Sequence, residues 1–198
     1  MNIIERAKNM IVTPKTEWPV ISSESTTAQQ VVMTYVLPLA LADAAAAFIG
    51  HGFLSGGHMS VSWGIYSAIL VFVSCILSVF IAAFVVDALA PSFGSEKNFD
   101  RSARLVAYGF TPSLVGGLLA IYPPIAIIGS LFGLYGIYLW YLGLGPMKNT
   151  PEDKKAIYLI VTVVILIAIW IVVGLILAAI LMPIFGLSSL SRFGGGIR

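Results

Sequence analysis

One acidic residue, Asp43, lies within an apolar segment long enough to cross a bilayer. A carboxylate near the middle of a membrane-spanning helix costs about 2.5–3.5 kcal/mol on insertion scales, whereas each Leu, Ile, Phe or Val contributes only about 0.3–0.6 kcal/mol. Asp43 must therefore face protein or water, or carry a proton. The functional interpretation is a proton or cation site, or a contact for a lipid headgroup. The alternative, which is the commoner case, is a structural carboxyl that hydrogen-bonds neighbouring helices.

Polar residues in two other apolar segments lie at a depth similar to that of Asp43. Ser74 and Ser78 share one face of the second segment, and Thr111 and Ser113 are near the middle of the third. Polar side chains inside a bilayer have few partners other than one another. We therefore predict one intramembrane polar site, formed by these four residues and Asp43.

Two prolines leave backbone carbonyls without their helical partners. Pro112 has no N–H to donate to the carbonyl of Tyr108, and Pro38 has none for the carbonyl of Thr34. A freed carbonyl inside a bundle can bind a polar ligand, but it is more often satisfied by a nearby Ser or Thr.

Residues that would indicate catalysis or metal binding are sparse. The chain has no phosphate-binding Walker loop, no His-Glu-x-x-His and no Gly-x-Ser-x-Gly pattern. His51 and His58 flank a Gly-rich segment, but without a paired acid or Cys they make a poor metal site. The single cysteine, Cys75, cannot form a disulfide within the chain. We expect a protein that is not an enzyme and that uses no metal or cofactor.

The composition indicates which kind of element positions these residues. Of the 198 residues, 59% are hydrophobic and 10% are charged, and the mean hydropathy is +0.97. A soluble domain of this length could not bury so much apolar surface. The net charge of +2 is too small to suggest binding to nucleic acid. The sequence therefore predicts a polytopic membrane protein.

Five apolar segments are each close to or above the roughly 20 residues needed to cross about 30 Å of hydrocarbon. Because backbone groups in lipid must be satisfied internally, each segment should be helical. The predicted fold is all-α: a transmembrane bundle of five helices, preceded by a short amphipathic interfacial helix. An N-terminal segment at 1–30 and a flexible outer tail at 183–198 flank the five-helix region at 31–182. The predicted spans are 31–50, 63–86, 105–122, 124–144 and 156–182.

The basic residues are unevenly distributed among the connections. Nine of the eleven precede the first span or lie in the second and fourth connections, and the other two are in the C-terminal tail. The positive-inside rule then places the N-terminus in the cytoplasm and the C-terminus outside.

The N-terminal residues 2–13 place apolar side chains on one helical face and polar side chains on the other. This helix is expected either to lie on an anionic leaflet or to pack on the protein's own loops. Pro14 and Pro19 are expected to end it, and Trp18 to anchor the chain at the membrane interface. The residues expected to contact lipid headgroups are Arg6, Lys8, Lys148, Lys154 and Lys155.

The two cytoplasmic connections carry local signals. Asp87, at the end of the second span, is expected to form an ion pair with Arg101 or Arg104. The run Thr150-Pro151-Glu152-Asp153 has the composition of a helix start, with a capping residue, a proline and acids in the first turn. The fifth span should begin there.

Glycines concentrate in the third and fourth spans, and Gly129 and Gly133 are four residues apart. Small residues at this spacing let two helices approach closely. The commoner use is packing within the chain, and homodimerisation is the alternative.

Several motifs resemble those of one family. They are TPKTEWPVISSES at 13–25, YGFTP at 108–112, GLYGIYLWYLGL at 133–144 and MKNTPEDKK at 147–155. Together they make the chain similar, over most of its length, to the bacterial branch of the Ypt-interacting protein (Yip) family. The resemblance implies a five-span fold with a cytoplasmic N-terminus, located in the bacterial inner membrane. Eukaryotic members associate with prenylated Rab-type GTPases, and no functional residue is carried over from them.

The leading hypothesis is a non-enzymatic membrane-organising or protein-interaction module that acts through its cytoplasmic face. That face would comprise residues 2–13 and the connections 87–104 and 148–155. The expected partners are membrane lipids and an unidentified membrane or cytoplasmic protein, with a homo-oligomer as an alternative. The competing hypothesis is a small transporter, channel or lipid-handling protein with Asp43 at its polar centre.

Overall fold

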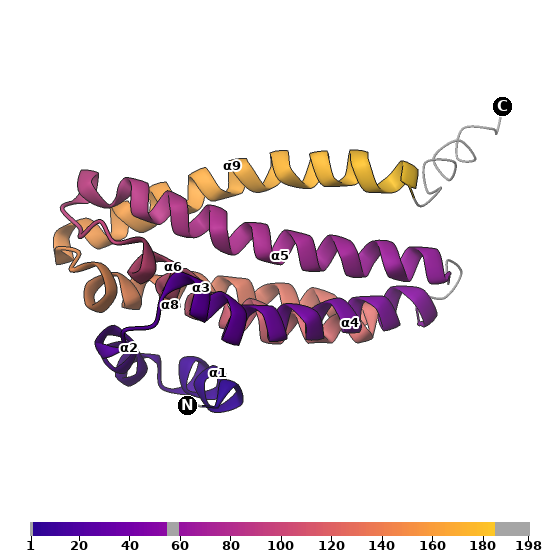
Figure 1. Cartoon of the computed structure of the whole chain (residues 1–198), viewed down its shortest axis with the longest axis horizontal. Coiled ribbons are helices and arrows are strands. Elements are labelled where there is room, and N and C mark those ends of the chain that lie inside the picture. The colour runs from indigo at the N-terminus through magenta and orange to yellow at the C-terminus, as the bar shows by residue number, and fades with distance from the viewer. Residues whose placement is uncertain (1, 55–59, 185–198) are drawn as a thin grey trace.

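Five helices long and apolar enough to cross a membrane run alongside one another in the computed structural model (Figure 1). The structure describes residues 2–54 and 60–184, so His58 and the tail from residue 185 onward lie outside it. The predicted all-α fold with five spans is confirmed. Each span begins before the apolar segment that predicted it, and all but the third also end after it: Ala28–Phe53, Val61–Phe93, Phe99–Ile121, Pro123–Lys148 and Glu152–Ile184.

The first span changes its helical winding near a proline. It begins as α3 (Ala28–Val31), passes through the π-helical turn η1 (Val32–Val36) and continues as α4 (Leu37–Phe53). Because Pro38 cannot donate to the carbonyl of Thr34, the regular series of α-helical hydrogen bonds is interrupted, and one wider π-helical turn precedes the proline.

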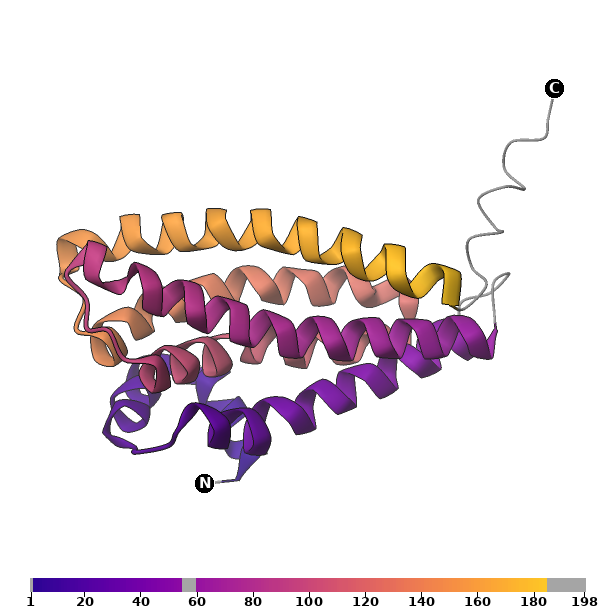
Figure 2. The same ribbon diagram turned by 45° about the horizontal axis from the view of Figure 1, so that its top comes forward.

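Three of the other spans are single long helices. The second, α5 (Val61–Leu89), ends in the 3-10 turn η2 (Ala90–Phe93), and the fourth, α8 (Ala126–Lys148), follows the turn η4 (Pro123–Ile125). The fifth, α9 (Glu152–Ile184), starts within the predicted helix-start run. It packs beside α5 at the edge of the bundle (Figures 1 and 2), and only 6% of its most apolar stretch is buried. Most of the surface of α9 therefore faces outward.

The third span is broken in the middle. It consists of α6 (Phe99–Gly109), α7 (Thr111–Gly117) and the 3-10 turn η3 (Leu118–Ile121). Pro112 stands in the first turn of α7, and the Thr111 hydroxyl donates to the carbonyl of Tyr108 at 2.6 Å. The carbonyl that the proline frees is thus satisfied by a neighbouring threonine, as expected.

Glycines bring the third and fourth spans into backbone contact. A Cβ atom placed on Gly129 would lie 2.3 Å from the carbonyl oxygen of Gly116. At Gly133 the nearest atom, the Ser113 Oγ, would be 3.6 Å away, so Gly116 is the closer partner of this helix face. The close approach joins α7 to α8, and packing within the chain accounts for Gly129 without a second copy.

The N-terminal segment forms two helices instead of one. α1 (Ile3–Val12) is followed by α2 (Pro14–Ser23), which contains both prolines that were expected to break the helix. Pro14 occupies the first turn of α2, where a missing N–H costs nothing. Trp18 is 1% exposed and packs against α8, since a Cβ on Gly143 would lie 2.8 Å from its ring. The prediction that Trp18 anchors the chain at the membrane interface is therefore wrong.

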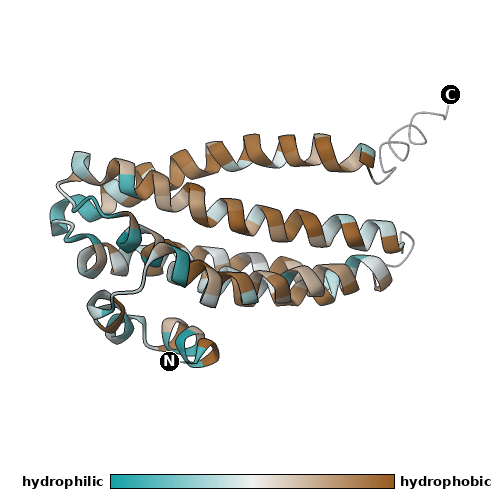
Figure 3. Ribbon diagram, viewed as in Figure 1, coloured by the Kyte–Doolittle hydropathy of each residue, from teal (hydrophilic) through white to brown (hydrophobic). Residues whose placement is uncertain are grey.

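Polar residues gather at one end of the bundle. Figure 3 shows hydrophilic residues around the end of α5, the start of α9 and the two N-terminal helices, whereas the long helices are predominantly hydrophobic along their length. We call this the charged end: α1, α2, and the connections at 90–98 and 149–151 with the helix ends that they join. It is the end at which the sequence predicted an interaction face.

Candidate functional site

Asp87 lies at the charged end, where the last turn of α5 meets the connection to α6. Its side chain is largely buried, and its Oδ1 accepts hydrogen bonds from the Asn98 backbone N–H at 2.8 Å and the Ser102 hydroxyl at 3.0 Å. The same oxygen lies 3.1 Å from the Lys148 ammonium. The carboxylate is therefore bonded by groups from α6 and α8 as well as by the loop between α5 and α6.

Lys148 is fully buried at the C-terminus of α8. Besides Asp87, its ammonium donates to the Ser102 hydroxyl at 2.7 Å and to the Asn98 carbonyl at 3.2 Å. Two predictions are corrected here. Asp87 pairs with Lys148 instead of Arg101 or Arg104, and Lys148 does not contact lipid headgroups because no part of its side chain is exposed.

The two arginines of the predicted pair have other partners. Arg101 lies 3.3 Å from Glu96 in a partly exposed ion pair. Arg104 is buried and donates to the carbonyls of Ile21, at 2.9 Å, and Glu24. These carbonyls lie at the end of α2, where the Ile21 carbonyl also accepts the Glu24 N–H, so the guanidinium adds donors at a helix C-terminus, a position that favours a positive charge. Arg104 thereby joins the N-terminal segment to α6.

Arg6 fixes the first helix to the second. Its guanidinium pairs with Glu17 at 2.6 Å and with Glu24, and it lies 5.3 Å from the centre of the Tyr108 ring. Arg6 is buried, so its predicted contact with headgroups is not available in this structure. The apolar side chains of α1 are divided: Met10 is buried against the protein, whereas others on the helix face outward.

Of the remaining lysines predicted to touch headgroups, one is buried and two are exposed. Lys155 donates to Glu152 at 2.5 Å and has little exposed surface. Lys8 and Lys154 are exposed, so both can reach a headgroup or a protein. Sequence reasoning expected an internal pair only for Asp87, and it missed that Arg6, Lys148 and Lys155 also pair within the protein.

These contacts form two bonded groups that meet on α6, one around Arg6 and Arg104 and one around Asp87 and Lys148, and we call the two together the clasp. Its ion pairs and hydrogen bonds link both N-terminal helices with α5, α6 and α8. The members are Arg6, Glu17, Glu24, Asp87, Asn98, Ser102, Arg104 and Lys148.

A second polar site lies inside the bundle. Asp43, Ser74, Ser78 and Ser113 line one cavity of about 160 Å³, which is otherwise apolar. Four of the five residues predicted from their depth are thus brought together. Thr111 is not among the lining residues: it is fully buried and its hydroxyl lies 2.7 Å from the Tyr35 hydroxyl.

One oxygen of the Asp43 carboxyl, Oδ1, is buried without a hydrogen bond to any described residue. Asp43 is 6% exposed, and its Oδ1 has no hydrogen-bond partner in the described part of the chain. The carboxyl packs on Gly117, where an added Cβ would lie 2.5 Å from Oδ2. Ser78 donates to the carbonyl of Ser74 at 2.5 Å, not to Asp43. The predicted structural role, a carboxyl bonded to neighbouring helices, is therefore not seen for this oxygen.

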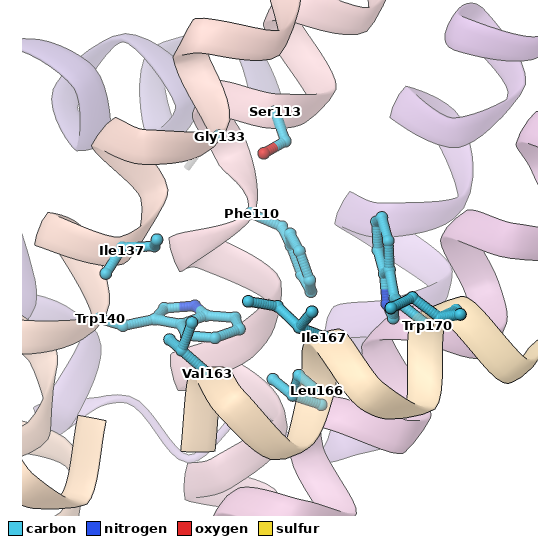
Figure 4. Close-up of a pocket in the computed structure, with 10 residues that line it drawn as sticks. Phe110, Ser113, Gly133, Ile137, Trp140, Val163, Leu166, Ile167 and Trp170 are labelled. Carbon is cyan, nitrogen blue, oxygen red and sulfur yellow. The ribbon is translucent and has the colours of Figure 1, made fainter. Parts of the chain in front are cut away.

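An apolar groove of about 440 Å³ adjoins the cavity (Figure 4). The groove lies between α7, α8 and α9, and it shares Phe110, Ser113 and Trp170 with the cavity. Sequence reasoning did not single out Trp170. It could have been noticed as a lone Trp deep within an aliphatic span, far from the interface positions that Trp prefers.

No cluster of three or more His, Cys, Asp or Glu that could hold a metal occurs within residues 2–54 and 60–184. His51 Nδ1 lies 3.1 Å from the carbonyl of Ala47, one turn earlier in its own helix.

The fold and these two sites define an integral membrane protein with five spanning helices, a charged end closed by internal pairs, and a polar cavity among its helices. The Yip1 domain profile matches residues 8–175, so the chain belongs to the Yip1 domain family. The family resemblance carried by the motifs is confirmed.

Curated relatives are inner membrane proteins. The chain is 26% identical over 151 residues to the inner membrane protein YohC of Escherichia coli K12, covering 71% of this chain and 77% of YohC. The same values hold for YohC of Escherichia coli O6:H1 strain CFT073. No solved structure matches the chain.

Proposed function

We propose that this protein is a non-enzymatic interaction module of the bacterial inner membrane, and that its charged end is the surface that a protein partner recognises. The observation that carries the proposal is the clasp. Its two bonded groups hold three segments that are distant in sequence, residues 2–24, 87–104 and 148–155, together through α6. The location is supported by the relatives, which are inner membrane proteins.

The charged end faces the cytoplasm in this proposal. It carries the nine basic residues that precede the first span or lie in the second and fourth connections. Five of these are exposed or partly exposed, and the positive-inside rule counts them whether or not they pair internally. The N-terminus is then cytoplasmic and the C-terminus is outside.

The exposed part of the charged end could contact either a protein or lipid headgroups, and its composition favours a protein. On α1, Ile4 and Val12 are 73% and 66% exposed, and Lys8 lies between them in sequence. Near the start of α9, Glu152 and Lys154 are exposed. A surface that mixes apolar groups with charges of both signs is typical of recognition between proteins, whereas lipid headgroups favour a predominance of basic residues.

The test is site-specific photo-crosslinking in native membranes. A photoreactive amino acid replaces Lys8 or Lys154 at the charged end, or Ile171 on the outward face of α9 as a control. We expect the same protein to be captured from the first two positions and not from the third. In an Arg104→Met background, which releases α2 from α6, capture from position 8 should fall, whereas Arg101→Met should leave it unchanged.

The proposal of a single recognition surface would be contradicted if positions 8 and 154 captured different proteins. It would also be contradicted if capture from position 8 were equal in the Arg104→Met and Arg101→Met backgrounds. The orientation has its own check. A reporter that is active only in the cytoplasm should be inactive when fused after residue 198, and activity there would overturn the proposed topology.

A transporter, channel or lipid-handling role is the second candidate, and one observation favours it. The cavity that contains Asp43 adjoins a groove that opens to the lipid-facing side of α9. Flux or transbilayer lipid movement in liposomes that changes on Asp43→Asn would support this role, and unchanged movement would remove its basis.

A further inference from the structure

The groove and the cavity form one elongated site with an apolar part and a polar part. They share Phe110, Ser113 and Trp170, and Figure 4 shows the Phe110 ring between the indoles of Trp140 and Trp170 with Ser113 nearby. We propose that this site binds a membrane lipid with a small, uncharged, hydroxyl-bearing head, such as a diacylglycerol or a long-chain alcohol. The hydrocarbon chain of the lipid lies in the groove, and the hydroxyl of its head donates a hydrogen bond to Asp43.

The polar part offers an acceptor that the protein does not use. The Oδ1 of Asp43 is buried and has no partner in the described chain, although leaving a buried acceptor unpaired costs about 1–3 kcal/mol. Gly117 leaves the space in which this carboxyl sits, so packing holds it in place. A hydroxyl donor from a ligand would satisfy the free oxygen.

Serines complement such a hydroxyl. The side chains of Ser74 and Ser113 line the cavity, and neither Oγ makes a hydrogen bond within the described residues. A hydroxyl head can donate to the carboxyl and accept from a serine at the same time, which a purely apolar ligand cannot do.

The lining excludes a phosphate-bearing head. Asp43 is the one charged residue among those that line the cavity, and the groove lining contains none. A phosphate buried there would meet a carboxylate and no cation, and burial of an uncompensated anion is strongly unfavourable. An uncharged head avoids this cost.

The apolar part is sized and placed for a lipid chain. Its volume of about 440 Å³ is within the range of pockets that hold small organic ligands. Ile167 and Ile171, on its lining, are 56% and 60% exposed on the outward face of α9. The hydrocarbon chain of a lipid can therefore enter the groove directly from the bilayer, without crossing water.

Depth along the helices agrees with a lipid whose head lies below the membrane surface. At 1.5 Å per residue, Asp43 is about 22 Å from Ala28 at the start of its span, and Trp170 is about 22 Å from Lys155. Both positions are deep in the hydrocarbon region, where a phospholipid headgroup is not stable but a single hydroxyl is tolerated.

The experiment uses the full-length protein in liposomes with three photoreactive lipids that carry the same diazirine acyl chain. One is a diacylglycerol, the second its O-acetylated form, which has no hydroxyl, and the third a phosphatidylethanolamine. We expect the diacylglycerol to label peptides of α8 and α9 that line the groove at least fivefold more than the other two. Asp43→Leu should reduce this labelling to the level of the acetylated lipid, and Ile176→Ala, outside the groove on α9, should not.

Each alternative outcome overturns the assignment. Equal labelling by the acetylated lipid would mean that the site does not recognise the head hydroxyl. Preferential labelling by phosphatidylethanolamine would mean that the site binds a lipid with an ammonium head. Wild-type labelling in Asp43→Leu would exclude Asp43. If Asp43→Leu does not fold, Ser113→Ala replaces it, with a partial loss expected. The inference concerns binding alone, so it stands or fails independently of partner capture at the charged end and of lipid transport.

Discussion

Removing either member of the Lys148–Asp87 pair should destabilise the protein far more than removing an exposed pair. Lys148 is fully buried and donates to Asp87, Ser102 and Asn98. Asp87→Leu would leave a buried ammonium with two neutral acceptors. Lys148→Met would leave the carboxylate with the Asn98 N–H and the Ser102 hydroxyl. Breaking a buried pair in this way costs about 3–5 kcal/mol, and Asp87→Leu should lie at the upper end because the stranded ammonium is the less exposed group.

The double variant separates pairing from packing. Once both charges are gone, no uncompensated charge remains, so Asp87→Leu with Lys148→Met should cost less than the sum of the single changes by about 2–3 kcal/mol. The partly exposed Arg101–Glu96 pair is the matched control, and Arg101→Met should cost about 0–1 kcal/mol.

The assay is reversible unfolding in mixed micelles or bicelles, followed by tryptophan fluorescence. Trp18 and Trp140 are buried near the charged end and the groove and report loss of packing there. Additive single changes, or singles no worse than Arg101→Met, would refute the claim that this pair holds the charged end together.

Two further predictions follow from contacts within the bundle. Gly129→Ala should destabilise the α7–α8 contact by about 1–3 kcal/mol, because its Cβ would lie 2.3 Å from the Gly116 carbonyl, whereas Gly174→Ala, with no atom nearby, should have no such cost in the same unfolding assay. Tyr158→Phe should cost about 0.5–1.5 kcal/mol and speed hydrogen exchange at the end of α5, because the buried Tyr158 hydroxyl donates to the Val86 carbonyl; unchanged exchange there would contradict that role.

The five spans were predictable because the bilayer imposes a length and a composition on each of them. A chain has few ways to hide twenty apolar residues, and hydrogen bonding within lipid requires helix. The cluster around Asp43 was predictable for a related reason: polar groups at one depth have few partners except one another. Thr111 was wrongly included because positions 111 and 113 point about 200° apart around a helix, so that Thr111 contacts Tyr35 when Ser113 lines the cavity, and an argument from depth does not consider direction.

The clasp was not predictable from spacing. Lys148 and Asp87 are separated by 61 residues, and Arg6 and Glu24 by 18, so no local pattern relates them. Charge counting assigns such residues to a side of the membrane but says nothing about whether they face water. The missed second helix has a similar origin: Pro14 and Pro19 lower the helical propensity of α2, but Trp18 gains burial against α8.

The break at Phe110 relates the two candidate sites to each other. On one side of it, α6 carries Ser102 and Arg104 of the clasp, and on the other, α7 carries Ser113 and lies against the cavity. Because the clasp fixes α6 to both neighbouring helices and to the N-terminal segment, movement of the third span is restricted on that side. The Thr111 hydroxyl donates across the break to the Tyr108 carbonyl, and it is also hydrogen-bonded to the Tyr35 hydroxyl of the first span. Phe110, which lines both the groove and the cavity, thus directly follows the helix that the clasp bonds to its neighbours, although no clasp residue lines either compartment.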